Sequence, residues 1–265
     1  MVALLMFLAF QFIGQAAVQT MAFLNHSHDP IGDSVAWALA ISSLATIAAM
    51  LLMSPFRMID DYKRVGCSNK DAIMALVILL LSIVAATAIN DKIDRIFNLD
   101  MANEYKQLFN KLLSSPVGIV AICLLGPVSE EMVFRGGVMK PLLQRKVRPW
   151  TAILASAALF AVVHGNLVQM IFALMMGVVM GVIYYRTQSL ILTSVAHIAN
   201  NSVSALILLK YPELDNWNPE QMLGPIMFYI LVAVIVVALY VLIRHFWHNT
   251  SDMEGKFVLD HTFKI

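Results

Sequence analysis

Residues 118–139 read GIVAICLLGPVSEEMVFRGGVM, an apolar stretch of membrane-spanning length that contains Glu130, Glu131 and Arg135. A charged side chain at the centre of a bilayer costs at least about 2.5 kcal/mol, so such residues face a bundle interior or a water-filled cavity and mark function. The stretch therefore predicts a transmembrane helix inside a helical bundle, with its two adjacent acids serving a polar site.

The composition of the whole chain is that of a membrane protein. Of its 265 residues, 60% are hydrophobic and 13% are charged, which excludes an ordinary soluble domain. Eight apolar segments are candidates for membrane spans, at 2–24, 35–56, 72–89, 117–139, 150–163, 167–185, 190–209 and 223–246. The fifth is short, and we expect it to extend past His164. The sequence thus predicts an all-α fold, a polytopic membrane helical bundle of about eight transmembrane helices with a central polar cavity.

Basic residues orient this bundle, because short cytoplasmic loops collect Lys and Arg. They gather in two connections, as Arg57, Lys63, Arg64 and Lys70, and as Lys140, Arg145, Lys146 and Arg148. With eight spans, both termini are then cytoplasmic. We expect residues 1–247 to form a single transmembrane bundle and residues 248–265 a short cytoplasmic tail. The compact chain without long loops favours a bacterial plasma membrane.

Three further features are an amphipathic segment, a pair of glycines and two cysteines. From 93 to 113, apolar residues recur at intervals of three or four, which predicts an amphipathic helix at the outer membrane interface. Gly177 and Gly181 form a small-xxx-small pair that lets another helix approach closely. Cys67 falls in a predicted cytoplasmic loop and Cys123 in a helix, so we expect no disulfide between them.

A small set of polar residues remains in the second half once the lipid-compatible ones are set aside. They are Glu130, Glu131, Arg135, His164, Asn166, His197, Asn200 and Asn201. Glu131 and Arg135 are four residues apart and share a helix face, so we expect an ion pair between them. That pair leaves Glu130, which points elsewhere, for a different partner. Glu130 is therefore predicted to be the reagent and Glu131 a supporting residue.

Proline chemistry suggests how water reaches the acids. Pro127 lies one turn before Glu130, and a proline within a helix frees the carbonyl four residues earlier and kinks the helix. We expect a local opening beside Glu130 and Glu131 that admits water.

Two histidines and an asparagine complete the candidate site. His197 and Asn201 lie four apart on one helix face, and both can donate hydrogen bonds to a developing oxyanion. Asn200 lies about 100° off that face. His164 shares a stripe with Phe160, and its occurrence beside a membrane Glu favours function over a buried structural role. At about 1.5 Å per residue, Glu130, His164 and His197 fall roughly 15, 21 and 12 Å deep, compatible with one cavity.

Three motifs on separate apolar helices resemble the pattern of a known family. They are E-E-x-x-x-R at 130–135, F-x-x-x-H at 160–164 and H-x-x-x-N at 197–201, with further similarity in the run GVVMGVIYYRTQSL at 177–190. In order and spacing they resemble the CPBP family, the type II CAAX prenyl proteases and bacteriocin-processing "Abi" proteins, which are intramembrane glutamic endopeptidases. The first half of the chain carries no matching motif.

The resemblance implies a catalytic set and a supporting pair. The catalytic residues would be Glu130, His164, His197 and Asn201, and the supporting residues Glu131 and Arg135. In this scheme the first glutamate is the general base on a water molecule that the first histidine orients, while the second histidine and the asparagine stabilise the tetrahedral intermediate. The partners would be a membrane-associated or lipidated peptide or protein substrate and the lipid bilayer, with no cofactor, no metal and no nucleic acid. The oligomeric state stays open.

Two other classes of protein use similar residues. A zinc-dependent intramembrane metalloprotease would take Glu130, His164 and His197 as ligands, although the H-E-x-x-H signature is absent and Asn201 is a poor zinc ligand. A membrane regulator or immunity protein without proteolysis would use the polar cluster for gating instead. Proton-coupled transport is less well supported, because no inverted repeat with paired broken helices is visible.

Overall fold

The computed structural model describes residues 2–24, 33–52, 58, 68–97, 101–165, 167–210 and 219–248, and every element within these ranges is a helix. In chain order the elements are α1 (Val2–Leu24), α2 (Asp33–Leu52), α4 (Asn69–Phe97), α5 (Met101–Leu113), α6 (Pro116–Val120), η1 (Ala121–Leu125), α7 (Gly126–Glu131), η2 (Met132–Met139), α8 (Lys140–Gln144), α9 (Pro149–Val162), α10 (Leu167–Thr187), α11 (Leu190–Lys210), α12 (Pro219–Leu223) and α13 (Pro225–His248). The predicted all-α bundle is confirmed.

The apolar segments account for the membrane spans. Among the described residues, six helices are long and apolar enough to cross a membrane: α2, α4, the continuous rod Pro116–Gln144, α10, α11 and α13. Two more apolar stretches, Val2–Ala17 within α1 and Pro149–Val162, are shorter. All eight predicted segments therefore form helices where the structure describes them. α1 has the predicted bounds, 2–24, whereas α9, with 14 residues, lacks the length of a full span. The protein is an integral membrane protein.

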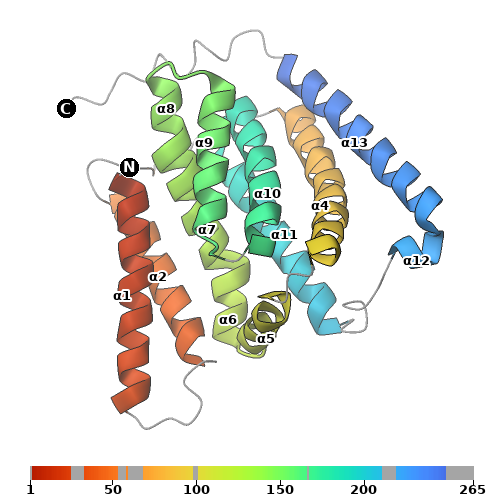
Figure 1. Ribbon diagram of the computed structural model, residues 1–265. Coiled ribbons are helices and arrows are strands. Elements are labelled where there is room, and N and C mark those ends of the chain that lie inside the picture. The colour runs from red at the N-terminus through yellow and green to blue at the C-terminus, as the bar shows by residue number, and fades with distance from the viewer. Residues whose placement is uncertain are drawn as a thin grey trace.

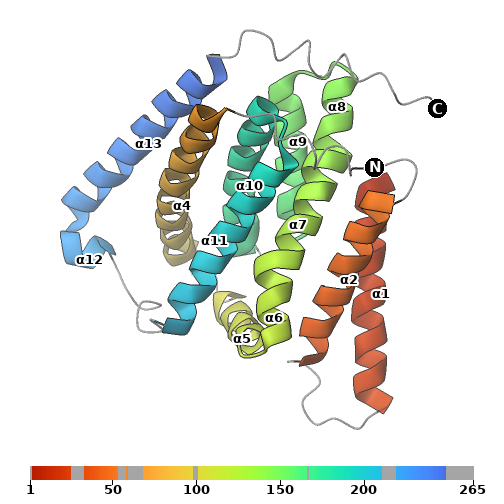
Figure 2. The same ribbon diagram turned by 180° about the vertical axis from the view of Figure 1, so that it is seen from behind.

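The helices run roughly side by side in both views (Figures 1 and 2). α1 and α2 pair along one flank, α9 packs along α10, and α4 lies between α10 and the peripheral α13. The rod Pro116–Gln144 occupies the middle and contacts α2, α9 and α11. The start of α1, the connection from α8 to α9 and the end of α13 lie at the upper end of Figure 1, whereas α5 and α12 lie towards the lower end.

The apolar core is centred on η2. Val133, Phe134 and Met139 are fully buried there, together with Ile153 of α9 and Ile183 of α10. The predicted close approach at the glycine pair is also present. A Cβ atom on Gly177 would lie 3.0 Å from the Cβ of Ala157, and one on Gly181 would lie 2.9 Å from a methyl carbon of Ile153. Gly177 and Gly181 therefore allow α10 to pack tightly on α9.

Two predicted boundaries are wrong. The fifth apolar segment does not carry its helix past His164, because α9 ends at Val162. The N–H groups of His164 and Gly165 instead bond three residues back, to Ala161 and Val162, at 3.1 and 3.2 Å. Gly165 then takes a left-handed conformation, with φ of +69°, that stops the helix.

The predicted amphipathic helix over 93–113 is in fact divided. Residues 93–97 are the last turn and a half of α4, which runs on to Phe97. A separate helix, α5, covers only Met101–Leu113. Apolar periodicity gave the right helical state on both sides of 98–100 but could not show that the chain leaves one helix and begins another.

The predicted tail lies outside the described residues from 249 onwards, and so do Arg57, Lys63, Arg64 and Cys67 in the connection after α2.

Candidate active site

The rod that carries the two glutamates is not a uniform α-helix. It contains two π-helical segments, η1 just before Pro127 and η2 just after Glu131. Such wider turns leave carbonyl groups out of register and recur at functional sites. Both segments find a polar partner on a neighbouring helix: Phe134 O accepts a hydrogen bond from Ser156 Oγ at 2.8 Å, and Ile122 O accepts one from Asn201 Nδ2 at 3.0 Å.

The Ile122 carbonyl is available because of Pro127. The N–H of Gly126 bonds to Ala121 O, five residues back, so the next group in this register would bond to Ile122 O. Pro127 has no N–H to give. The carbonyl that the proline frees is thus that of Ile122, five residues earlier, and not four residues earlier as predicted. Asn201 Nδ2 donates a hydrogen bond to it.

This contact orients two asparagines in sequence. Since a carbonyl only accepts, Asn201 must present its Nδ2 to Ile122, and its Oδ1 then faces the other way. Asn200 Nδ2 donates to that Oδ1 at 3.0 Å. Asn200 is buried and lines the same cavity as Asn201, which its angular offset on the helix did not predict.

Glu131 and Arg135 form the predicted ion pair. Arg135 Nη1 lies 3.2 Å from Glu131 Oε1, and both side chains are fully buried. Arg135 Nη2 also donates to the carbonyl of Gly177 at 3.2 Å, and the guanidinium lies 5.1 Å from the ring centroid of Phe160. The pair therefore fixes the rod against both α9 and α10.

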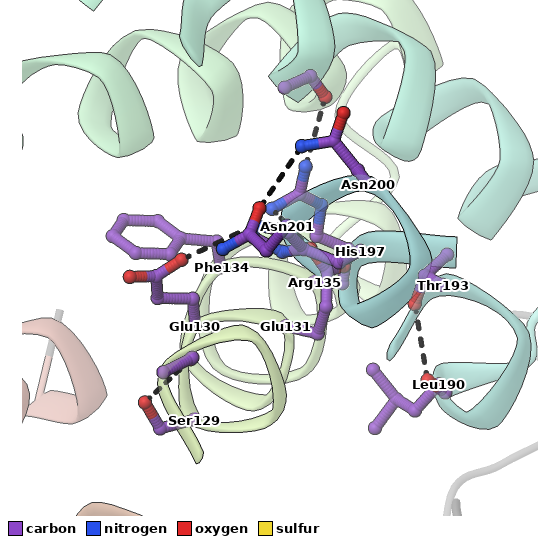
Figure 3. A network of polar contacts seen from close by, with 12 residues as sticks. Ser129, Glu130, Glu131, Phe134, Arg135, Leu190, Thr193, His197, Asn200 and Asn201 are labelled. Carbon is purple, nitrogen blue, oxygen red and sulfur yellow. Dashed lines mark hydrogen bonds and ion pairs between the residues drawn. The ribbon is translucent and has the colours of Figure 1, made fainter. Parts of the chain in front are cut away.

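His197 joins the two glutamates, which the sequence did not predict (Figure 3). Its Nδ1 lies 3.0 Å from Glu131 Oε1, and its Nε2 lies 3.6 Å from Glu130 Oε2. The first contact is a hydrogen bond in which Nδ1 donates, because a carboxylate only accepts. The second is an electrostatic contact, too long for a hydrogen bond.

Glu130 and Glu131 occupy different environments, as predicted. The side chain of Glu131 is fully buried, whereas that of Glu130 is 22% exposed and lines a cavity. In Figure 3 the Glu130 carboxylate extends away from Arg135.

His164 is held by the helix that precedes it. Its Nδ1 lies 2.7 Å from Phe160 O, and since a carbonyl only accepts, Nδ1 carries the proton. Nε2 of the neutral ring is then a hydrogen-bond acceptor. The ring of Phe160 packs edge-on against both His164 and His197, at centroid distances of 4.7 and 5.8 Å. Phe160 therefore contacts both imidazole rings and sets the distance between them.

A cavity of about 910 Å³ collects these residues. Its lining includes Glu130, His164, His197, Asn200 and Asn201, and its remaining walls are mostly apolar. Volumes of roughly 300–1,000 Å³ with a few convergent polar groups are typical of ligand sites. The cavity therefore has the size and the convergent polar groups of a ligand site.

Several remaining sequence expectations can be placed here. Within the described ranges, no three His, Cys, Asp or Glu side chains are grouped closely enough to hold a metal ion. Asn166 lies outside the described residues. Sequence reasoning also overlooked Gln11, Gln15 and Ser43, which come from α1 and α2 and line the cavity. The four-residue spacing of Gln11 and Gln15 on an apolar helix could have indicated that they face a cavity.

Comparisons with known proteins point to one family. Residues 112–203, which contain Glu130, His164, His197, Asn200 and Asn201, match the family model described as "Type II CAAX prenyl endopeptidase Rce1-like". The chain is also 26% identical over 127 residues to the Bacillus subtilis (strain 168) protein named "Putative membrane peptidase YdiL", which covers 48% of this chain and 51% of that protein. The chain thus spans about half the length of this relative.

No solved structure matches the chain. The two sequence matches nonetheless agree with the family predicted from the three motifs, and the matched segment contains all of those motifs. For the segment that holds the site, the two matches support the CPBP family.

Proposed function

We propose that this protein is an intramembrane endopeptidase that hydrolyses a peptide bond in a membrane-associated or lipidated peptide or protein. The observation that carries the proposal is that α7, α11 and the turn after α9 meet at one cavity. Glu130, His164 and His197 all line it, and the Glu130 carboxylate lies 3.6 Å from His197 Nε2. The family of the matched segment supports the same class of reaction.

In the proposed mechanism, Glu130 is the general base. A water molecule between Glu130 and His164 would donate one hydrogen bond to the carboxylate and the other to Nε2 of His164, which the Phe160 carbonyl keeps as an acceptor. Attack on the scissile carbonyl transfers a proton to Glu130, which then delivers it to the leaving amine. Water and the peptide bond are consumed, and a carboxylate and an amine are formed.

The proposed oxyanion site uses His197 and Asn201. Asn201 Nδ2 has two hydrogens, of which one is held by Ile122, so the second is available to the oxyanion. His197 Nδ1 is engaged by Glu131, so Nε2 donates only when the ring carries both protons. Glu131 orients the ring, and Arg135 holds Glu131 in place.

We further propose that the end of the bundle with the α8–α9 connection is cytoplasmic, in a bacterial plasma membrane. Arg145, Lys146 and Arg148 lie in that connection, and the positive-inside rule then places the start of α1 and the end of α13 on the same side.

The proposal is tested by comparing the peptides of cells that carry wild-type protein with those that carry Glu130→Gln. Peptides present only with the wild type name the substrate. Hydrolysis of a peptide spanning that site by the purified protein should fall about 10²- to 10⁴-fold in the variant, the usual contribution of a general base. Glu220→Gln is a matched control, since it removes a carboxylate far along the chain in α12. Unchanged hydrolysis in Glu130→Gln would overturn Glu130 as the general base. Identical peptides in the two kinds of cell, with an unchanged cellular phenotype, would instead favour the regulator or immunity protein.

Metal dependence is tested on the same purified protein. His197 Nδ1 is engaged in its hydrogen bond to Glu131, and among the described residues no three His, Cys, Asp or Glu side chains are grouped closely enough to hold a metal ion. We expect hydrolysis to persist in a strong chelator. Loss of hydrolysis on chelation, with recovery on adding zinc, would establish the metalloprotease instead.

A further inference from the structure

Three polar side chains on the N-terminal helices form a polar strip, defined here as Gln11, Gln15 and Ser43. All three line the cavity that Glu130 also lines. Gln11 and Gln15 are four residues apart in α1 and so share one of its faces. Polar side chains are costly on apolar membrane helices unless they face a cavity or a partner. The strip lies outside the family-matched segment, which begins at residue 112, so the matched motifs do not account for it.

The strip can both donate and accept hydrogen bonds. Gln11 Oε1 lies 2.9 Å from Ser42 Oγ, whose single hydrogen also has the carbonyls of Ala38 and Leu39 within reach. This contact anchors the Gln11 amide, which has both a donor and an acceptor end. Gln15 makes no hydrogen bond within the described part of the chain and is exposed, so its amide offers a donor and an acceptor. Ser43 is only 2% exposed, yet it contributes to the cavity lining.

The spacing of the strip fits an extended peptide. Residues four apart in an α-helix are separated by about 6 Å along its axis. In an extended chain, groups on the same edge recur every second residue, or about 6.6 Å. An extended peptide lying along α1 can therefore meet Gln11 and Gln15 with successive main-chain groups of one edge.

The close packing of α1 on α2 keeps the strip in place. A Cβ on Gly14, between the two glutamines, would lie 3.1 Å from Ala38 O and 3.3 Å from Ser42 Cβ. α2 in turn contacts α7, the helix that carries Glu130. The strip and the acid thus belong to adjoining walls of one cavity.

We propose that Gln11, Gln15 and Ser43 bind the main chain of an extended substrate peptide and hold its scissile bond at Glu130. This inference rests on the proposed peptidase function. Because the strip would recognise main-chain N–H and C=O groups, it selects for an extended conformation and not for particular side chains. These are positioning residues, and their loss should raise KM more than it lowers kcat.

The first experiment uses a quenched fluorescent peptide spanning the cleavage site found by the peptide comparison, with purified protein in lipid nanodiscs. Gln11→Met and Gln15→Met keep the side-chain length but remove the hydrogen bonds. Each should raise KM about two- to tenfold, the range for one neutral hydrogen bond, with kcat nearly unchanged. Phe12→Met is the matched control, because Phe12 lies between the two glutamines and is 76% exposed, and its KM should equal that of the wild type.

A second experiment separates binding from indirect structural effects. Peptides in which a single main-chain N–H is replaced by an ester oxygen should raise the wild-type KM at one or two positions near the scissile bond. At the position served by Gln15, the same ester should add no further increase in Gln15→Met. Equal ester effects in the two proteins, or a fall in kcat without a change in KM, would overturn the proposed strip. Full activity in Glu130→Gln would instead overturn the peptidase mechanism itself, so the two failures are distinguishable.

Discussion

The buried pair Glu131–Arg135 gives the most stringent stability prediction, through the substitution Arg135→Leu. Arg135 is fully buried and holds Glu131 Oε1 at 3.2 Å and Gly177 O at 3.2 Å. Removing it leaves a buried carboxylate whose remaining hydrogen-bond donor is His197. Breaking a buried pair from one side costs about 3–5 kcal/mol, because the surviving charge is uncompensated.

The double variant Glu131→Leu with Arg135→Leu should be less damaging than Arg135→Leu alone. Replacing both members of a buried pair with apolar side chains is often close to neutral. What remains is the loss of the acceptor for His197 Nδ1, worth about 1–3 kcal/mol. We expect the double variant to be the more stable of the two, but inactive, because His197 is no longer oriented.

The chain contains a matched control pair. Asp91 and Arg95 have the same four-residue spacing and lie 2.9 Å apart, but their side chains are 44% and 42% exposed. An exposed helix pair of this kind contributes about 0.3–0.5 kcal/mol. Arg95→Leu should therefore change the free energy of unfolding by no more than that amount.

The assay is equilibrium unfolding of the purified protein in mixed detergent micelles, followed by helical circular dichroism, for the wild type and the four variants that complete the cycle and its control. Additive costs of Glu131→Leu and Arg135→Leu would refute the coupling of the two charges. If Arg135→Leu lowered the free energy of unfolding no more than Arg95→Leu does, the predicted penalty for leaving Glu131 buried without its partner would be refuted.

Two further predictions concern packing and pH. Gly177→Ala should lower the free energy of unfolding by about 1–3 kcal/mol despite the better helix propensity of Ala, because the new Cβ would lie 3.0 Å from that of Ala157. Gly136→Ala should cost less in the same unfolding assay. Its close contact, at 2.6 Å, is with the flexible end of Met58, and Leu190 Cδ1 lies at an ordinary van der Waals distance of 3.5 Å. The hydrogen bond from Lys92 lowers the pKa of Glu220 below its ordinary value of 4.5. The link between α4 and α12 should therefore hold above that value and weaken as pH falls below it, seen as faster hydrogen exchange in α12.

Residue spacing within the motifs predicted the contacts between neighbouring residues of the site. A separation of four residues predicts the ion pair of Glu131 and Arg135 and the contact of His164 with Phe160. Both are present, although Arg135 lies in the π-helical η2 and His164 lies just past the end of α9. These contacts are local, so a 3.6-residue period suffices to derive them.

Contacts between helices could not be derived in this way. The position of His197 between Glu130 and Glu131 depends on the rotation of α11 against the rod, which a sequence period does not determine. The π-helical turns of η1 and η2 also shift the register of the rod by one residue at each place. Gln11 and Gln15 were overlooked because polar residues were sought only in the second half of the chain.

Pro127→Ala tests whether that register shift serves the site. The substitution supplies an N–H that can bond to Ile122 O, the group that Asn201 Nδ2 now occupies. Helix stability should rise, since Ala is about 3 kcal/mol more favourable than Pro in a helix interior. Hydrolysis should nevertheless fall, because Asn201 loses the acceptor that orients both it and Asn200. When unfolding and hydrolysis are measured on the same variant, we expect a more stable and less active protein. A variant that gains stability and keeps full kcat would mean that the proline only bends the rod, and that the asparagines are oriented by other contacts.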